Sequence, residues 1–185
     1  QNSQIKGKLL LTHSYEENYV ESGDFDTDLA RFRTKNDGQM DDVHQLRTLH
    51  GADVAVLLIN SDAYCGLAST IMAICDQSFA IVYHGCATGY YSFGHEIGHL
   101  LGTRHNPEMD GADTPFAYGH GFQHVSGNPK WRTIMAYNCN GGCPRLQYWS
   151  NPNVKYDGFP MGTADRHDNA RVLNQTIPTL GQCLP

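Results

Sequence analysis

Short apolar runs and helical spacings alternate along the first hundred residues. The runs at 5–14 (IKGKLLLTHS), 53–60 (DVAVLLIN) and 78–85 (SFAIVYHG) have strand length and are rich in apolar residues, so each predicts a strand. A polar, turn-rich stretch follows the first run. Helices are expected at 39–52, where apolar residues recur every three positions, and at 90–102. This order indicates a mixed α/β fold class.

The pattern changes after Gly102, where Gly, Pro, Asn and Asp become dense and strand signals fade. A last helix is expected at 166–177. We therefore predict one domain over 1–185, with a regular upper subdomain at about 1–102 and an irregular lower subdomain at about 103–185. A cleft where two such parts meet is a natural place for a site.

Composition narrows the classes of partner. Hydrophobic residues make up 40% and charged residues 17% of the chain, which is typical of a globular protein. The net charge of −6, without a Lys/Arg cluster, argues against nucleic acid as a partner. No apolar run is long enough to span a bilayer, so no membrane partner is expected.

Six cysteines, an even number, indicate three disulfides and an oxidising compartment. We predict the pairs Cys139–Cys143, Cys65–Cys75 and Cys86–Cys183; free buried thiols or a metal site are the alternatives. The chain opens QNSQIKGKLL without an initiator methionine, which we interpret as a mature, secreted form that has lost a signal and a pro-segment.

The segment HEIGHLLGTRH (95–105) holds the strongest chemical signal. His95 and His99 are four residues apart, so on a helix both side chains lie on one face with about 6 Å of rise between them. His105 can join them only if the helix ends, and Gly102 can take the left-handed conformation that ends a helix and turns the chain. Three histidines with room for a water form an open, catalytic zinc site. A helix that is merely rich in histidine is the alternative.

Glu96 follows the first of these histidines. With three imidazoles as ligands, its carboxylate is free to accept a proton from the attacking water. His120 and His124 are further histidines in the sequence YGHGFQH. Because the three ligands already fill the site, we interpret both as structural or surface residues.

The segment 95–105 matches HExxHxxGxxH, so the chain resembles the metzincin zinc peptidases. The sequence WRTIMAYNC (131–139), about 30 residues after His105, resembles the methionine turn of that clan. Together with YGHGF and QYWSNPNVKYDGFPMGT, these motifs are similar to the bacterial peptidyl-Asp metalloendopeptidases, the endoproteinase Asp-N group, which are themselves similar to reprolysins. This resemblance covers about 41–185.

The resemblance implies a fold and a set of roles. A mixed twisted sheet with two main helices would lie above an irregular lower part, with one zinc ion in the cleft between them. His95, His99 and His105 would be the ligands, Glu96 the general base and Met135 a hydrophobic floor. The protein would be a secreted, monomeric endopeptidase made as a zymogen, with protein or peptide substrates and Asp on the leaving-group side.

Further site residues follow from that chemistry. Tyr137 could donate its hydroxyl to the developing oxyanion, as in some metzincins; a half-buried structural tyrosine is the alternative. A cation should grip the substrate Asp, with Arg145 the first candidate and Lys155 and Arg166 the alternatives. An edge strand should hold the peptide by strand addition, and we assign that role to Phe79, Ala80, Ile81 and Val82.

Two other readings stay open. One is a metzincin endopeptidase of different specificity, and the other is an inactive binding module that kept the scaffold. The acidic loop EMDGAD (108–113) is too short and irregular to match an EF-hand, so the sequence leaves calcium binding open.

Overall fold

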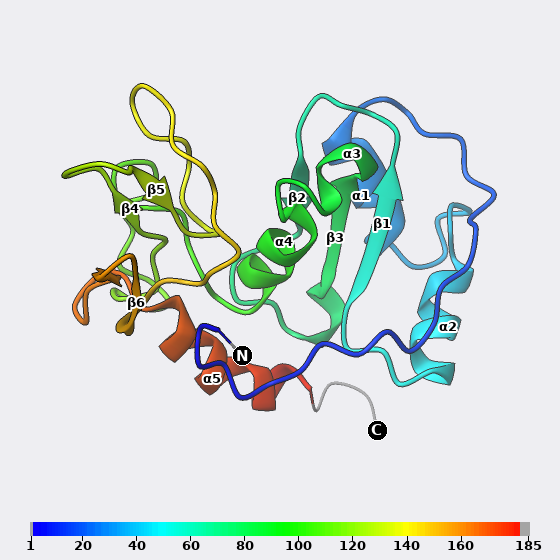
Figure 1. Ribbon diagram of the computed structural model, residues 1–185. Helices are drawn as coiled ribbons and strands as arrows, with labels where there is room; N and C mark the ends of the chain where they lie inside the picture. The colour runs from blue at the N-terminus through cyan, green and yellow to red at the C-terminus, as the bar shows by residue number, and fades with distance from the viewer. Residues whose placement is uncertain (1, 182–185) are drawn as a thin grey trace. The chain divides into compact units, whose positions relative to one another are not determined.

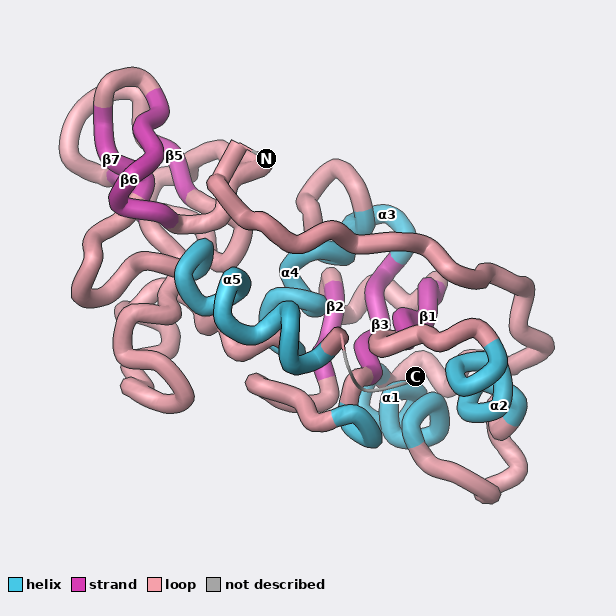
Figure 2. The backbone as a smooth tube through the Cα atoms, turned by 90° about the horizontal axis from the view of Figure 1, so that it is seen from below, coloured by secondary structure: helices cyan, strands magenta, loops and turns pink. Residues whose placement is uncertain are grey.

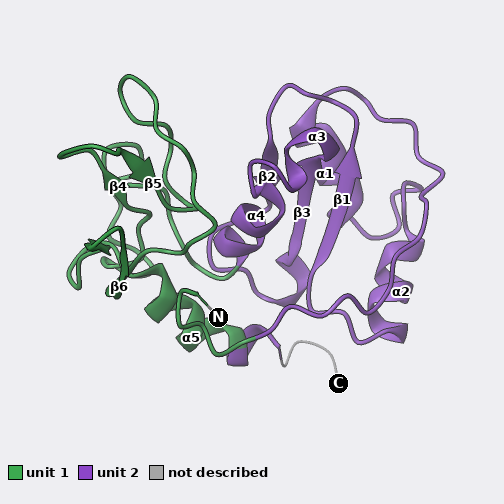
Figure 3. Cartoon of the chain, viewed as in Figure 1, with its two compact units in different colours: residues 1–7, 101–177 green, residues 8–100, 178–185 purple. Residues whose placement is uncertain are grey.

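The computed structural model describes residues 2–181, which fall into two compact units. Unit 1 comprises residues 1–7 and 101–177, and unit 2 comprises residues 8–100 and 178–185 (Figure 3). Within the described part of the chain, no helix combines the length and apolar character needed to cross a membrane.

Unit 2 holds a three-stranded sheet with helices around it (Figure 1). The predicted mixed α/β class is confirmed. Its elements are α1 (Phe25–Arg33), α2 (Asp42–Leu49), β1 (Ala55–Ile59), β2 (Gly66–Ala68), the 3-10 turn η1 (Cys75–Gln77), β3 (Phe79–Tyr83), α3 (His84–Ala87) and α4 (Ser92–Leu100).

The sheet has the strand order β1-β3-β2, so β3 is its central strand. β3 pairs in parallel with β1 and antiparallel with β2. The prediction that Phe79, Ala80, Ile81 and Val82 form an edge strand is therefore wrong. Both edges of β3 already make ladder hydrogen bonds, and all four side chains are fully buried. The edges of this sheet are β1 and β2.

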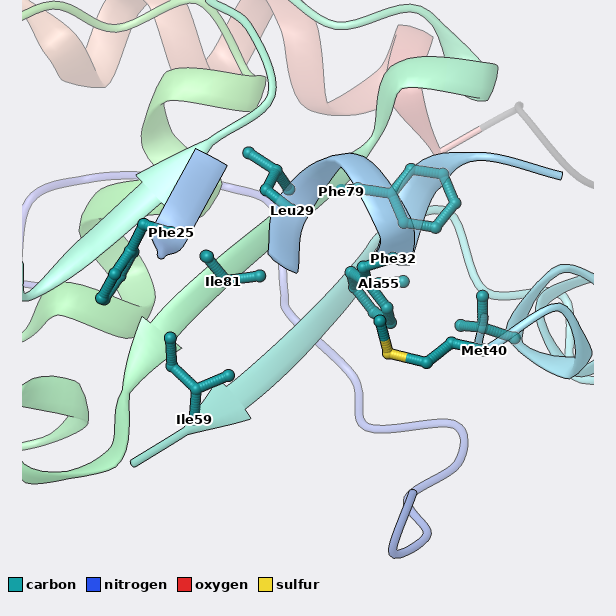
Figure 4. Close-up of a cluster of buried hydrophobic side chains, with 9 residues drawn as sticks. Phe25, Leu29, Phe32, Met40, Ala55, Ile59, Phe79 and Ile81 are labelled. Atoms are coloured by element: carbon teal, nitrogen blue, oxygen red, sulfur yellow. The ribbon is translucent and has the colours of Figure 1, made fainter. Parts of the chain in front are cut away.

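The core of unit 2 forms between α1 and the sheet (Figure 4). Phe25, Leu29 and Phe32 point from α1 onto Phe79 and Ile81 of β3. The rings of Phe32 and Phe79 meet edge to face, with centroids 5.3 Å apart. Burying each of these side chains contributes about 1.5–3 kcal/mol to stability, so α1 anchors the strand that precedes the candidate site.

Helix α1 was not predicted from the sequence, because it lies in the stretch interpreted as polar and turn-rich. Its signals are at its ends: the Asp24 side chain accepts a hydrogen bond from the Thr27 N–H at 2.8 Å and caps the helix. Acidic residues occupy the first turn and Arg31 and Arg33 the last, as the helix dipole favours.

The strand expected at 5–14 is absent from the structure, where these residues pair with no ladder partner. Leu9, Leu10 and Leu11 are all exposed, so the apolar run does not enter the core here. The helix predicted at 39–52 is confirmed as α2, and Gly51 follows it with a left-handed φ of 58°. The strands expected at 53–60 and 78–85 are confirmed as β1 and β3.

Unit 1 has little regular structure. Its strands form two separate two-stranded sheets, and the hairpin of the second is visible in Figure 2. The last helix begins three residues after the predicted start. The elements are β4 (Gln123–His124), β5 (Trp131–Arg132), β6 (Asn151–Tyr156), β7 (Phe159–Met161) and α5 (Asn169–Leu180), whose last three residues belong to unit 2.

One predicted disulfide is confirmed and two are wrong. Cys139 and Cys143 are bonded, but Cys65 is bonded to Cys86, not to Cys75, which is itself disulfide-bonded. The physical reason is the antiparallel pairing of β2 with β3, which brings the residue before β2 beside the helix after β3. The predicted partner of Cys86, Cys183, lies outside the described residues.

Candidate metal centre and its surroundings

Helix α4 carries the first two histidines of the motif. His95 and His99 are buried, with 6% and 7% of their surfaces exposed. Their rings lie 4.8 Å apart, nearly perpendicular, as expected for residues one turn apart on a helix. The helix begins after Tyr91, whose positive φ of 59° turns the chain out of the preceding loop. The sequence spacing thus predicted correctly that His95 and His99 lie one turn apart on a helix.

The chain then turns at Gly102. Helix α4 ends at Leu100, and Gly102 has a φ of 95°, the left-handed conformation that the sequence predicted for it. His105 follows on a non-helical segment. One ligand atom from each of His95, His99 and His105 lies within 4.8 Å of the other two.

This cluster fits zinc in the type and number of its donors. Three imidazole nitrogens are the ligand set of open zinc sites, and ligation requires neutral imidazoles. The pKa of His105 is lowered to about 4, chiefly by burial; the charge of Asp110 opposes this shift and the charge of Arg145 adds to it. His105 is therefore neutral near pH 7. In the described part of the chain, no other group of three or more His, Cys, Asp or Glu residues brings its ligand atoms within 4.8 Å of one another.

Glu96 lies beside His95 on α4 and is also buried, with 5% of its surface exposed. A buried carboxylate is costly unless other groups compensate it, so its place next to a cation site is chemically consistent. Glu96 directly follows the first histidine of the motif, which is the position that its assignment as the general base requires.

A further buried histidine, outside the cluster, contacts the backbone of His105. The ring of His120, fully buried, makes a hydrogen bond of 2.8 Å through Nδ1 to the carbonyl oxygen of His105. Because a carbonyl only accepts, Nδ1 carries the proton. His124 stacks on Trp131 with ring centroids 5.0 Å apart. Both histidines are thus packed into unit 1, in line with a structural role.

Asn106 ties the His105 segment to the methionine turn. Its side-chain oxygen accepts a hydrogen bond of 2.9 Å from the backbone N–H of Tyr137, and its amide nitrogen donates to Glu108 at 2.9 Å. Asn106 is almost fully buried. The only sequence signal for this role is its position next to His105.

Met135 lies in a tight turn closed by a hydrogen bond of 3.1 Å from the Ala136 N–H to the Thr133 carbonyl. The methionine side chain is fully buried, as a hydrophobic floor requires. Gly121 packs against the backbone of this turn: an added Cβ would lie 2.5 Å from the Ala136 nitrogen and 2.6 Å from the Met135 carbonyl carbon. Only glycine fits there.

The ring of Tyr137 packs against the third histidine at a tilt of 45°. The centroids of the Tyr137 and His105 rings are 4.4 Å apart, and the tyrosine keeps 41% of its surface exposed. Its backbone is fixed at both ends, because its carbonyl also accepts a hydrogen bond of 2.8 Å from the Gln123 side chain. The tyrosine is therefore held beside a ligand with part of its surface accessible.

The three candidate specificity cations differ in their surroundings. Arg145 donates to the Ala136 carbonyl at 3.4 Å, and the buried Arg132 donates to the same oxygen at 3.0 Å. Two guanidinium groups thus meet just after Met135. Lys155 is exposed on the hairpin strand β6, and Arg166 forms an ion pair with Asp113.

Comparison with known proteins agrees with this geometry. Residues 2–150 match the model of metallo-peptidase family M12. The chain is 54% identical over 180 residues to a peptidyl-Asp metalloendopeptidase of Stenotrophomonas maltophilia (strain K279a), covering 97% of this chain and 43% of that protein. It is 43% identical over 163 residues to a peptidyl-Asp metalloendopeptidase of Pseudomonas fragi, covering 88% of this chain and 83% of that protein.

A solved structure described as a chaperone-substrate complex shares the fold, with a TM-score of 0.68 at 21% identity over 90% of this chain and 26% of that chain. The present chain spans about two fifths of the length of the Stenotrophomonas relative. The family match covers most of the chain, including the three histidines, Glu96 and the methionine turn. The chain belongs to metallo-peptidase family M12.

Proposed function

We propose that this chain is the catalytic domain of a secreted zinc endopeptidase that cleaves peptide bonds on the amino side of Asp. The single observation that carries the proposal is the cluster of three histidines with a buried glutamate beside the first of them. The preference for Asp is supported by the names of the relatives, peptidyl-Asp metalloendopeptidases, and by the two guanidinium groups that bind the Ala136 carbonyl next to Met135.

Each residue of the proposed active site has a separate role in hydrolysis. A zinc ion held by His95, His99 and His105 would polarise the scissile carbonyl and make water acidic enough to deprotonate near neutral pH. Glu96 accepts the proton of the attacking water and then delivers it to the leaving amine. Tyr137, fixed by Asn106 at its backbone N–H, can donate its hydroxyl to the oxyanion that develops.

The substrate requires an extended conformation and an edge to pair with. Because β3 is central, we assign this role to β2, the edge strand that packs against α4. A peptide added to the outer edge of β2 would gain backbone hydrogen bonds without disturbing the ladder.

We assign recognition of the substrate Asp to Arg145. A guanidinium can bind a carboxylate through two parallel hydrogen bonds, which a lysine cannot do. Its hydrogen bond to the Ala136 carbonyl, which also accepts from Arg132, places Arg145 next to the methionine turn. Arg166 is less suited because Asp113 already neutralises its charge.

Arg145→Ala is expected to lower kcat/KM for a peptide with Asp on the leaving side by about 100-fold, the usual cost of removing one partner of a buried charge pair. A matched peptide with Ala at that position should change by less than threefold. Lys155→Ala, which removes an exposed charge, is the control and should affect neither peptide. An Arg145→Ala enzyme that keeps its preference for Asp would remove Arg145 from this role.

The setting of the enzyme is part of the proposal. Disulfides at Cys65–Cys86 and Cys139–Cys143 fit an oxidising compartment and hence secretion. We also propose that the precursor carries an N-terminal pro-segment, that the enzyme is a monomer, and that residues 1–185 form a single catalytic domain.

Metal removal tests the proposal. Treatment with a zinc chelator is expected to abolish hydrolysis of an Asp-containing peptide, and added zinc should restore it, because the three imidazoles supply no electrophile of their own. Hydrolysis at full rate by protein shown to be metal-free would contradict a zinc enzyme. A folded, zinc-loaded sample that binds peptides without cutting them would favour the binding-module alternative, and cutting before other residues would favour a different specificity.

A further inference from the structure

We propose that Gly66 is a positioning residue for Glu96: it must lack a side chain so that the Glu96 carboxylate can take its place. This inference rests on the proposed role of Glu96 as the general base. A Cβ added at Gly66 would lie 2.6 Å from Oε1, 2.7 Å from Cγ and 2.8 Å from Cδ of Glu96. The nearest contact is 0.8 Å closer than the 3.4 Å at which ordinary van der Waals contact begins.

The requirement for glycine comes from space and not from backbone conformation. Gly66 is not among the residues with a positive φ, and it lies in the strand β2 opposite Val82. An alanine can adopt this backbone, and in a strand it loses less conformational entropy on folding than glycine does. The closest contacts of an added methyl group, all with Glu96, are therefore the expected source of any loss caused by Gly66→Ala.

The strand cannot move away from the added methyl group. The residue before Gly66 is bonded by the disulfide Cys65–Cys86 to α3, and its carbonyl accepts a hydrogen bond of 3.1 Å from the Tyr83 N–H. Gly66 itself pairs with Val82, which is fully buried in the central strand. β2 is thus fixed at the position where the methyl group would enter.

The helix cannot move either. The segment after β2 donates two hydrogen bonds to the end of α4, from Met72 N–H to the His99 carbonyl at 2.9 Å and from Ala73 N–H to the Leu100 carbonyl at 2.8 Å. α4 also packs against β3. Because both backbones are held, the rotatable side chain of Glu96 is the part that must move.

The expected effect of Gly66→Ala follows from the displacement of the Glu96 side chain. Displacing the end of a flexible side chain costs little stability, but a displacement of about 1 Å in a catalytic group can lower a rate by about 100-fold. The three atoms nearest to the added methyl group all belong to Glu96 and none to a histidine of the cluster, so zinc binding should persist. Gly66 thus affects the chemical step through the space that it leaves for the Glu96 side chain, and not through a side chain of its own.

The experiment compares Gly66→Ala with Gly89→Ala in the full chain, loaded with zinc. Gly89 belongs to the same unit, has no positive φ, and has nothing within 4 Å of an added Cβ. Gly66→Ala is expected to lower kcat by about 100-fold, with KM within twofold, one zinc per chain and an unchanged melting temperature. Gly89→Ala should match the wild type in kcat, KM, zinc content and melting temperature.

A double-mutant cycle separates positioning from a general structural role. In the Glu96→Gln background, Gly66→Ala should cause no further loss of residual hydrolysis, because no base remains to be misplaced. Independent losses that add in the double mutant would overturn the inference, as would a wild-type kcat in Gly66→Ala or a large loss of stability or zinc.

Crystal structures of the wild type and Gly66→Ala give a readout that does not depend on activity. The Glu96 carboxylate should be displaced while β2 and α4 superpose; an unmoved carboxylate would overturn the inference. If the wild type hydrolyses no peptide, the proposed function fails, and the crystal structures still decide whether Gly66 positions Glu96.

Discussion

Glu96→Gln is expected to lower kcat by about 1,000-fold, in the range observed when a general base is removed. Gln keeps the size and polarity of the side chain but cannot accept the proton of the attacking water. Because the three histidines, and not Glu96, are the proposed zinc ligands, the variant should still bind one zinc per chain. Initial rates on an Asp-containing peptide, with zinc content measured on the same sample, check this result.

The control for this variant is Glu16→Gln, which makes the same chemical change at an exposed position in the same unit. It should leave both rate and zinc content unchanged. A Glu96→Gln enzyme that keeps more than a tenth of the wild-type kcat would contradict the assignment of Glu96 as the base.

Gly121→Ala is expected to destabilise the protein by about 3 kcal/mol, at the upper end of the cost of overpacking a core. The added Cβ would meet the backbone nitrogen of Ala136 at 2.5 Å, and backbone atoms in a closed turn cannot rotate away as a side chain can. For a chain of this size, the melting temperature should fall by about 10 °C. Thermal unfolding followed by circular dichroism measures the shift.

Gly111→Ala serves as the matched control in the same unit, because its added Cβ would make only an ordinary contact of 3.5 Å with the Pro107 carbonyl. Its melting temperature should stay within about 2 °C of the wild type. A Gly121→Ala protein as stable as the wild type would show that the methionine turn is not packed against this glycine.

The cluster of three histidines was the part of the molecule most open to prediction from sequence. His95 and His99 are linked by helical geometry, and the left-handed turn at Gly102 follows from the need to bring His105 back to them. Each inference uses residues within eleven positions of one another. Local geometry therefore sufficed.

The predictions that were wrong concern contacts between segments that are far apart in the sequence. β3 looked like an edge strand until its pairing with both β1 and β2 was known. Cys65 looked closest to Cys75 along the chain, but antiparallel pairing brings it to Cys86. Helix α1 was missed because its apolar face is short and its signals lie in its caps.

The residues that support the site were equally hidden. Gly66 and Gly121 matter for the space that they leave open, which depends on neighbours 30 and 15 positions away. The buried contacts of Asn106 and His120 likewise connect segments that no sequence spacing brings together. Sequence motifs predict the groups that react, whereas packing decides which residues hold them.

The most direct test of the account is a map of every bond that the zinc-loaded protein cuts in a denatured, sequence-diverse protein mixture, read by mass spectrometry. A zinc endopeptidase specific for Asp makes internal cuts that cluster on the amino side of Asp and that disappear when a chelator is added. No cuts at all by a folded, zinc-bound sample would contradict it.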